Sequence, residues 1–151
     1  MFKKAVLAFL ISMLPVVELR GGLPYGIALG LNYPVALMAA ILGNMVPVPF
    51  IIVYIRHIFH WLQKRSPWWG GKIEALEKNA HLKGRVVRKY STIGLCILVA
   101  IPLPGTGAWT GALVAAMLDI RLKRAVPTIF LGVCIAASIM TAVTFGLINF
   151  F

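Results

Sequence analysis

The chain has few acidic residues and few cysteines, and both shortages narrow its possible functions. Its 151 residues include four Asp and Glu, 15 Lys and Arg, and two Cys. No paired catalytic carboxylates, no Gly-x-Ser-x-Gly and no phosphate-binding P-loop stand out. Cys96 and Cys134 lie in apolar segments, where cysteine acts as a small hydrophobe and indicates neither a disulfide framework nor a metal ligand. We therefore expect a protein that is not an enzyme and has no cofactor.

Charge of either sign is scarce, and long stretches of the chain have none. Charged residues make up 13% of the sequence and hydrophobic residues 60%, with a mean hydropathy of +0.90. A soluble domain has about 25% charged residues. Residues 21–55, 91–118 and 125–151 contain no Lys, Arg, Asp or Glu. Because each run exceeds the ~20 residues that a membrane-spanning helix needs, the sequence predicts an integral membrane protein, with one domain over residues 1–151.

The net charge of +11 does not indicate nucleic-acid binding, because the basic residues are confined to a few places. Eight of the 15 lie between Lys64 and Lys89, and a second group lies at residues 121–124. Basic segments next to membrane helices mark the cytoplasmic side. Residues 1–17 have the basic start and apolar run of a signal peptide but no small-x-small cleavage site follows. We expect this segment to remain in the mature protein.

The otherwise apolar segment at residues 14–24, with the sequence LPVVELRGGLP, contains two charged residues. Glu18 and Arg20 stand two residues apart there, between prolines and a glycine pair. An ionisable pair is costly inside lipid, and intramembrane charges are functional by default. Prolines and glycines break helices, which lipid tolerates only where protein or a water-filled cavity covers the freed backbone. The pattern predicts a broken, charged tip inside the membrane.

Short apolar pieces on either side of this break lead into a long span. The pieces at residues 5–17 and 25–31 are too short to cross the ~30 Å hydrocarbon core as helices. Residues 35–62 form the first full-length span. Pro47 and Pro49 lie inside it and predict a kink near residues 44–46.

The second half of the chain follows the same plan. Arms at residues 92–101 and 108–118 flank a break at 102–107, and the last span covers 125–151. Interrupted helices in corresponding positions point to a transporter whose site lies at the interface of two repeats. The predicted divisions of the chain are repeat 1 at 1–63, a basic connector at 64–90 and repeat 2 at 91–151.

Two topologies are open for the broken segments. If each segment crosses the membrane, the connector and the basic group at 121–124 lie on opposite faces. If each returns as a re-entrant hairpin, both lie on the cytoplasmic face, as the positive-inside bias favours. Ten helical residues measure ~15 Å, half the hydrocarbon thickness. We therefore predict an all-α integral membrane protein, an inverted repeat of two units, each a re-entrant helical hairpin followed by a kinked transmembrane helix.

Two motifs resemble those of a known family. ELRGGLP at residues 18–24 and PLPGTGAWTG at 102–111 resemble the small multi-drug export proteins, which are similar to the DedA (SNARE-associated, VTT) superfamily. The resemblance covers nearly the whole chain. It implies re-entrant hairpins, movement of lipids across the bilayer, undecaprenyl phosphate as a bacterial substrate, and dependence on the proton-motive force. It also implies a prokaryotic plasma (inner) membrane, with the connector at 64–90 in the cytoplasm.

The sequence departs from the DedA pattern at the second motif. DedA proteins typically carry arginines around its proline, whereas residues 99–110 contain none. Arg20 in the first motif is then the residue that supplies positive charge. The transfer of the DedA mechanism to this chain therefore depends on Arg20.

The expected substrate- and proton-binding residues gather on the two tips. A carboxylate at the depth of Glu18 is desolvated, which favours its protonated form and suits proton coupling. Arg20 suits bidentate binding of a phosphate, and a structural ion pair with Glu18 is the alternative for both. The glycines either open N–H groups to an anion or allow close helix packing. The predicted site comprises Glu18, Arg20, Gly21, Gly22, Pro24, Asn44, Pro102, Pro104, Gly105, Thr106, Gly107, Trp109 and Thr110.

For residues away from the tips, the sequence also indicates structural roles. Asn44 either faces the cavity or makes a hydrogen bond between helices. Asp119 and Arg121 are expected at the membrane interface, as a cap and a topology anchor. His57 and His60 lie three residues apart without acidic or cysteine neighbours, so we expect no metal site.

Three functions remain open on the sequence alone. The leading one is translocation of an anionic lipid, undecaprenyl phosphate or a phospholipid, coupled to protons through two opposed re-entrant tips. The alternative is proton-coupled export of small, often cationic, drugs, and the third is a non-transporting membrane scaffold. A lone Glu18 suits a cation, whereas Arg20 with open glycine N–H groups suits an anion. We expect a homodimer, with membrane lipids and protons as partners and no nucleic acid.

Overall fold

The computed structural model describes residues 1–65, 68, 71–72, 84–103 and 106–150, and within these residues it is helical without a strand. Parts of the predicted connector, at 66–67, 69–70 and 73–83, lie outside this description. So do Pro104 and Gly105 of the predicted site. The helices are α1 (Phe2–Ser12), α2 (Glu18–Ala28), α3 (Tyr33–Met45), α4 (Pro47–Arg65), α6 (Gly84–Ala100), α7 (Ala108–Met117) and α8 (Leu122–Phe150).

Two segments of these helices are long and apolar enough to cross a membrane. One runs from Tyr33 to Leu62 through α3 and α4, and the other from Leu122 to Leu147 in α8; both have a peak hydropathy of 2.1. The predicted kink in the first span is confirmed, since Val46 separates α3 from α4 just before Pro47. The second span runs as one uninterrupted helix with Pro127 inside it, so the interruption found in the first span is not repeated there.

The first break lies earlier in the chain than predicted. α1 ends at Ser12, residues 13–17 form the break, and α2 begins at Glu18. Residues 18–24, which were predicted to interrupt the helix, are instead part of α2. Pro15 accounts for the real break, because proline lacks an N–H and disfavours helical geometry in the residue before it.

Two glycines of α2, Gly22 and Gly26, allow helices to pack closely and do not form a turn. A Cβ on Gly22 would collide with the Ser12 side chain of α1, and one on Gly43 of α3 would collide with the Phe9 carbonyl of α1. One turn after Gly22, Gly26 leaves room for small side chains of α1 and α3. Small residues at such contacts let membrane helices approach closely. The close-packing alternative is therefore the one that accounts for Gly22, and α1, α2 and α3 form one tight bundle.

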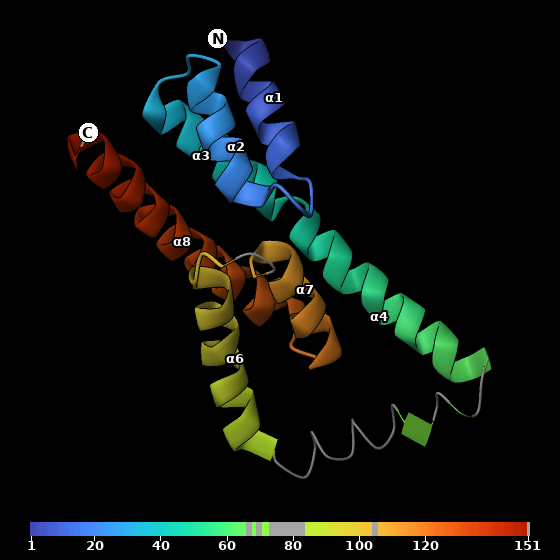
Figure 1. Cartoon of the computed structure of the whole chain (residues 1–151). Helices are drawn as coiled ribbons and strands as arrows, with labels where there is room; N and C mark the ends of the chain where they lie inside the picture. Colours follow the sequence, from blue (N-terminus) through green and yellow to red (C-terminus); the bar gives the residue numbers. More distant parts are fainter. Residues whose placement is uncertain (66–67, 69–70, 73–83, 104–105, 151) are drawn as a thin grey trace.

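A second bundle forms from α6, α7 and α8. Val99 of α6 lies between two glycines, Gly111 of α7 and Gly132 of α8, where added Cβ atoms would meet its side chain. α4 packs along α7 and thus joins the two bundles. In Figure 1, α1 and α2 form one antiparallel pair, α6 and α7 form another that approaches from the opposite end, and their tips meet in the middle of the molecule.

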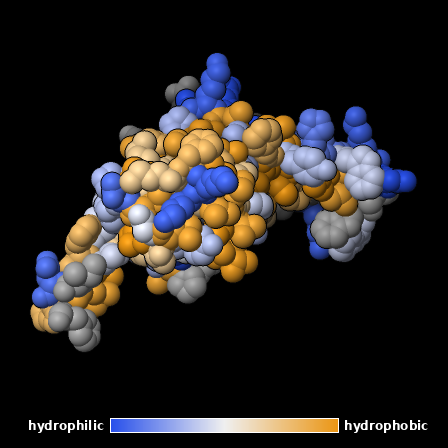
Figure 2. Space-filling model, turned by 90° about the horizontal axis from the view of Figure 1, so that it is seen from above, coloured by the Kyte–Doolittle hydropathy of each residue, from blue (hydrophilic) through white to orange (hydrophobic). Residues whose placement is uncertain are grey.

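The outer surface is apolar to an extent typical of a protein in lipid. Large hydrophobic side chains point outward from several helices, such as Phe50 at 72% exposed and Leu131 at 58%. In the view of Figure 2, hydrophobic residues cover most of the middle of the molecule, with some hydrophilic side chains among them, and hydrophilic residues are most frequent at the right-hand end. A soluble monomer rarely exposes so large an apolar surface, so this face fits the hydrocarbon region of a bilayer.

Candidate functional site

The candidate site is the contact between the two tips, with residues 13–18 and Arg20 on one side and residues 101–103 and 106–109 on the other. Arg20, in the first turn of α2, donates from Nη2 to the Thr106 carbonyl at 2.7 Å, to Thr106 Oγ1 at 2.9 Å and to the Ile101 carbonyl at 3.2 Å. Its Nη1 donates to the Leu103 carbonyl. These carbonyls lie in the second break, beyond the C-terminal end of α6 at Ala100. Arg20 therefore binds the segment that follows α6, from the other half of the chain.

Glu18 binds at the N-terminal end of the next helix, α7. Its side chain is buried, with the residue 7% exposed, and its Oε1 accepts the N–H of Trp109 at 3.2 Å. Trp109 lies in the first turn of α7, whose own N-cap residue, Gly107, has no side chain to offer. A carboxylate at a helix N-terminus and a guanidinium at a C-terminus both oppose the helix dipole favourably. Each of the two charges thus stabilises one end of the second break.

Contacts also run from the second tip to the first. The indole Nε1–H of Trp109 donates to the Met13 carbonyl at 3.0 Å. Gly107 lies against the Glu18 carboxylate so closely that a Cβ there would collide with it. The φ of Gly107 is 150° and its ψ is −165°, a region that essentially only glycine occupies. The tips therefore interlock, and Gly107 is required both by its backbone and by its neighbour.

The alternative in which Glu18 and Arg20 form a structural ion pair with each other is not what the tips show. Among the described residues an ion pair joins Arg56 and Asp119, and none joins Glu18 to Arg20. Each charge instead serves a separate helix end. Sequence reasoning singled out both residues but missed the partners of Arg20 at Ile101 and Leu103, and the partner of Trp109 at Met13. Those partners act through backbone carbonyls, for which the sequence holds no signal beyond the proline that follows Ile101.

The other predicted residues divide into those at the tips and those within helices. Thr106 Oγ1, besides accepting from Arg20, is within hydrogen-bond distance of the Ile101 carbonyl, at 2.7 Å, and of the Leu103 carbonyl, at 2.8 Å, which shapes the second tip. The Gly21 N–H donates to the Val17 carbonyl at 2.9 Å, so it is not open to an anion. Pro102 lies in the second break, while Gly22, Pro24 and Thr110 lie inside helices.

Asn44 is the buried polar residue of the first span. It is 2% exposed and lies in the last turn of α3, immediately before the kink. Its Oδ1 has no hydrogen-bond partner among the described residues. This oxygen therefore does not make the hydrogen bond between helices that was one of the two alternatives for Asn44.

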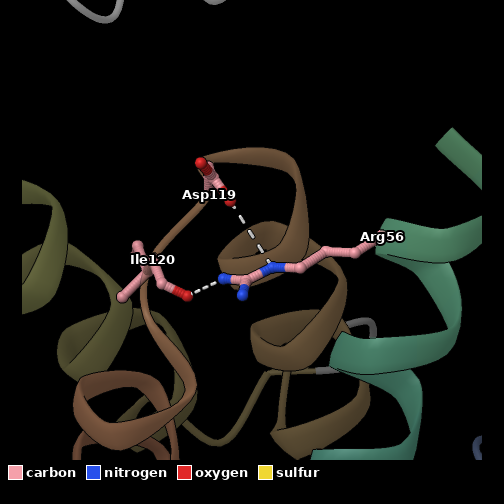
Figure 3. A network of polar contacts seen from close by, with 3 residues as sticks. All are labelled: Arg56, Asp119 and Ile120. Atoms are coloured by element: carbon pink, nitrogen blue, oxygen red, sulfur yellow. Dashed lines mark hydrogen bonds and ion pairs between the residues drawn. The ribbon is translucent and has the colours of Figure 1, made fainter. Parts of the chain in front are cut away.

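A polar contact at the far end of α7 ties that helix to α4. Arg56 of α4 places its Nε 3.6 Å from Asp119 Oδ1 and donates from Nη2 to the Ile120 carbonyl (Figure 3). The Asp119 side chain is 81% exposed, and ion pairs as exposed as this stabilise a protein by ~0–1 kcal/mol. Asp119 was expected at the interface as a cap, and it is the partner of Arg56 instead.

The part of the chain that the structure describes holds no group of three or more His, Cys, Asp or Glu side chains that could bind a metal ion. No curated protein matches the chain, and no solved structure does. A family model described as "Putative small multi-drug export protein" matches residues 18–139, which is most of the chain. The match begins at Glu18, so it includes Glu18 and Arg20 of the first tip and the whole of the second tip. The protein therefore belongs to the small multi-drug export protein family.

Proposed function

We propose that this chain is a proton-coupled exporter of small cationic compounds, with Glu18 as the group that protons and substrate share. The observation that carries the proposal is the engagement of Arg20. Its guanidinium is bonded to the carbonyls and hydroxyl of the second tip. It is therefore not available to a lipid phosphate, and the Glu18 carboxylate is the charge left at the tips for a substrate. This favours a cation, which agrees with the export description of the family.

The proposal includes an inverted repeat, which the spacing of equivalent features supports. Tyr33 and Leu122, the first residues of α3 and α8, are 89 residues apart, as are Ala28 and Met117, the last residues of α2 and α7. The same separation relates two pairs of packing glycines, Gly22 with Gly111 and Gly43 with Gly132.

The turns that follow α2 and α7 repeat at the same spacing. Gly30, with a φ of 80°, and Asp119, with a φ of 52°, are 89 residues apart in left-handed conformations. The residue after each donates its N–H five residues back: Leu31 to Gly26 at 3.1 Å and Ile120 to Ala115 at 3.0 Å. The two halves are thus built alike although few of their residues are identical. α8 runs opposite to α3 and α4 in Figure 1, as inversion requires.

The interlocked tips lie where the axis relating such repeats would pass. Glu18 and Gly107, which touch, are 89 residues apart, and so are Arg20 and Trp109, each of which donates to carbonyls of the opposite tip. Transporters built from inverted repeats place their site at this interface near the bilayer midplane. In the proposed arrangement both helix pairs are re-entrant hairpins, as in the DedA proteins that the sequence resembles.

Cysteine labelling tests this topology. Cysteines placed at Tyr90, which is 67% exposed at the start of the second hairpin, and at Arg121, after its end, are expected to react with an impermeant maleimide from the same, cytoplasmic, face of inner-membrane vesicles. A cysteine at Lys3 is expected to react from the opposite face. Labelling of positions 90 and 121 from opposite faces would show that the segment formed by α6 and α7 crosses the membrane. That result would contradict the proposed inverted repeat of re-entrant hairpins.

The proposed coupling follows from competition at one carboxylate. Ionised Glu18 attracts a cation, and a proton on the same group removes that attraction. Substrate and proton therefore exclude each other, and a proton that enters from outside releases the substrate there. Each event also changes the charge at the N-terminus of α7, which weakens or restores the contact between the tips.

Transport by purified protein in liposomes tests the function. Glu18→Gln is expected to abolish pH-driven ethidium transport, because glutamine neither ionises nor takes up a proton. Ethidium binding to the unaltered protein is expected to weaken as the pH falls and to be independent of pH in Glu18→Gln. Asp119→Asn, which neutralises an exposed carboxylate, is the control and is expected to keep transport.

A fluorescent polyprenyl phosphate in the same liposomes tests the competing hypothesis, translocation of an anionic lipid. Flipping of this lipid that depends on Arg20, without ethidium transport, would replace the proposed export function with lipid translocation. If the liposomes show neither ethidium transport nor lipid flipping, the third hypothesis, a membrane scaffold, remains.

A further inference from the structure

Asn44 is buried although the packing around it does not require a polar side chain. Burying an amide oxygen without a partner destabilises a fold, and Asn44 Oδ1 is in that state among the described residues. The residue 89 positions later is Val133, which is 1% exposed and apolar. Both follow a packing glycine, Gly43 or Gly132. Since the second half packs a valine at the equivalent place, packing alone does not explain the asparagine.

Asn44 lies near the tip end of its helix. Gly43 packs against Ser12 of α1, and Ser12 also packs against Gly22 of α2. From this common contact, Glu18 is one helical turn along α2 toward the tip, a rise of about 6 Å, and Asn44 is one residue along α3 in the same direction, a rise of about 1.5 Å. Glu18 and Asn44 therefore lie within about 5 Å of each other in depth, on neighbouring helices of the first bundle.

Asn44 lies on a helix that packs against the helix of Glu18. α3 packs mainly on α1 and α2, and Glu18 is the first residue of α2. Beyond the kink at Val46, the buried Val48 and Ile52 belong to α4, which packs mainly on α7. The N-terminus of α7 is where Glu18 binds, through Trp109. The unpaired acceptor of Asn44 thus lies where the span passes from its contacts with α1 and α2 to its contact with α7.

We infer that Asn44 is a specificity-determining residue of the export site, and that its Oδ1 accepts a hydrogen bond from an N–H group of the cationic substrate whose charge Glu18 holds. The inference rests on the proposed export function. The ligand class is an organic cation that carries N–H donors, such as a protonated or aromatic amine. A cation without donors gains nothing from Asn44, because an amide oxygen accepts hydrogen bonds and carries no net charge.

Two cations that differ in donors test this inference on the full-length protein in detergent. Asn44→Val places the residue of the second half at the equivalent position. It is expected to weaken binding of ethidium, which has two aromatic amines, roughly three- to tenfold, the loss of one hydrogen bond. Binding of tetraphenylphosphonium, which has no donor, is expected to stay within about twofold of the unaltered protein, since only a neutral acceptor is removed. Asn44→Thr, which matches valine in shape but keeps an oxygen, is expected to retain more of the ethidium affinity than Asn44→Val.

Stability and a control variant separate this role from a structural one. Asn44→Val is expected to raise the melting temperature, because it removes an unpaired buried amide. Val133→Ala, which trims the equivalent side chain without changing polarity, is expected to leave the ratio of the two affinities unchanged. If Asn44→Val does not reach the membrane, Asn44→Leu answers the same question.

Two results would overturn the inference: unchanged ethidium binding in Asn44→Val, or equal losses for both cations. Loss of pH dependence in Glu18→Gln together with normal ethidium binding in Asn44→Val would leave the export function standing and remove only the role of Asn44. Ethidium binding that is indifferent to Glu18 would remove the export function itself.

Discussion

Replacing Arg20 with methionine is expected to destabilise the protein by about 3 kcal/mol or more, because it removes the bonds that hold the second break after α6 to the first tip. Methionine keeps much of the length and apolar stem of arginine but donates no hydrogen bond. Arg20 bonds to three carbonyls of the second tip, and hydrogen bonds to charged groups each contribute about 1.5–3 kcal/mol. Thr106 Oγ1 can still serve the Ile101 and Leu103 carbonyls, so the loss is smaller than the sum. For a chain of this size the melting temperature is expected to fall by roughly 5–10 °C.

Thermal unfolding in detergent measures this effect, and Arg121→Met is its control. Arg121 is exposed after α7, so the same change there is expected to leave the melting temperature within about 1 °C, as for most surface substitutions. Arg20→Lys is expected to recover only part of the loss, because a single ammonium cannot reach all the acceptors that a guanidinium fork spans. A normal melting temperature in Arg20→Met would show that Arg20 is free to bind a substrate phosphate, and would restore the anionic-lipid hypothesis.

The sequence predicted the membrane helices well because lipid imposes a simple requirement. Uncharged runs of sufficient length have few other uses, and both full spans lie where the charge-free runs placed them. The kink at Val46 followed from Pro47, since proline removes a helical hydrogen bond wherever it stands inside a helix. These predictions depend on neighbouring residues alone, which is why the sequence could support them.

The first tip was misplaced because glycine has two uses in membrane helices. Gly21 and Gly22 suggested a turn, but Gly22 lies inside α2 and admits the Ser12 side chain of α1. That use depends on a neighbour ten residues away in sequence. The spacing of Gly22 and Gly26, four residues apart, was the available sign of a packed helix face. Glu18 and Arg20 stood out by their charge, yet their partners lie 81 to 91 residues away and are mostly main-chain atoms.

Replacing Gly107 with alanine is expected to be even more damaging, by about 3–5 kcal/mol, because two independent costs add at one position. The backbone there has a φ of 150° and a ψ of −165°, and a side chain in such a region costs about 1–3 kcal/mol. The new methyl group would also collide with the Glu18 carboxylate and push it away from the Trp109 N–H. The charge-assisted bond lost in this way contributes about 1.5–3 kcal/mol more. We expect the two tips to separate and transport to be lost.

Gly94→Ala is the matched control, since a Cβ added at Gly94 meets nothing within 4 Å and the residue lies inside α6. That change is expected to be neutral or to stabilise the protein by up to about 1 kcal/mol, as alanine for glycine does in a helix. The two costs at Gly107 can be separated in Glu18→Ala combined with Gly107→Ala. Removing the carboxylate relieves the collision but not the backbone strain, so the second substitution should cost less in the absence of Glu18 than in its presence. Equal costs in both backgrounds would mean that Glu18 and Gly107 act independently, and the interlocked tips could not then transmit protonation of Glu18 to the second half of the chain.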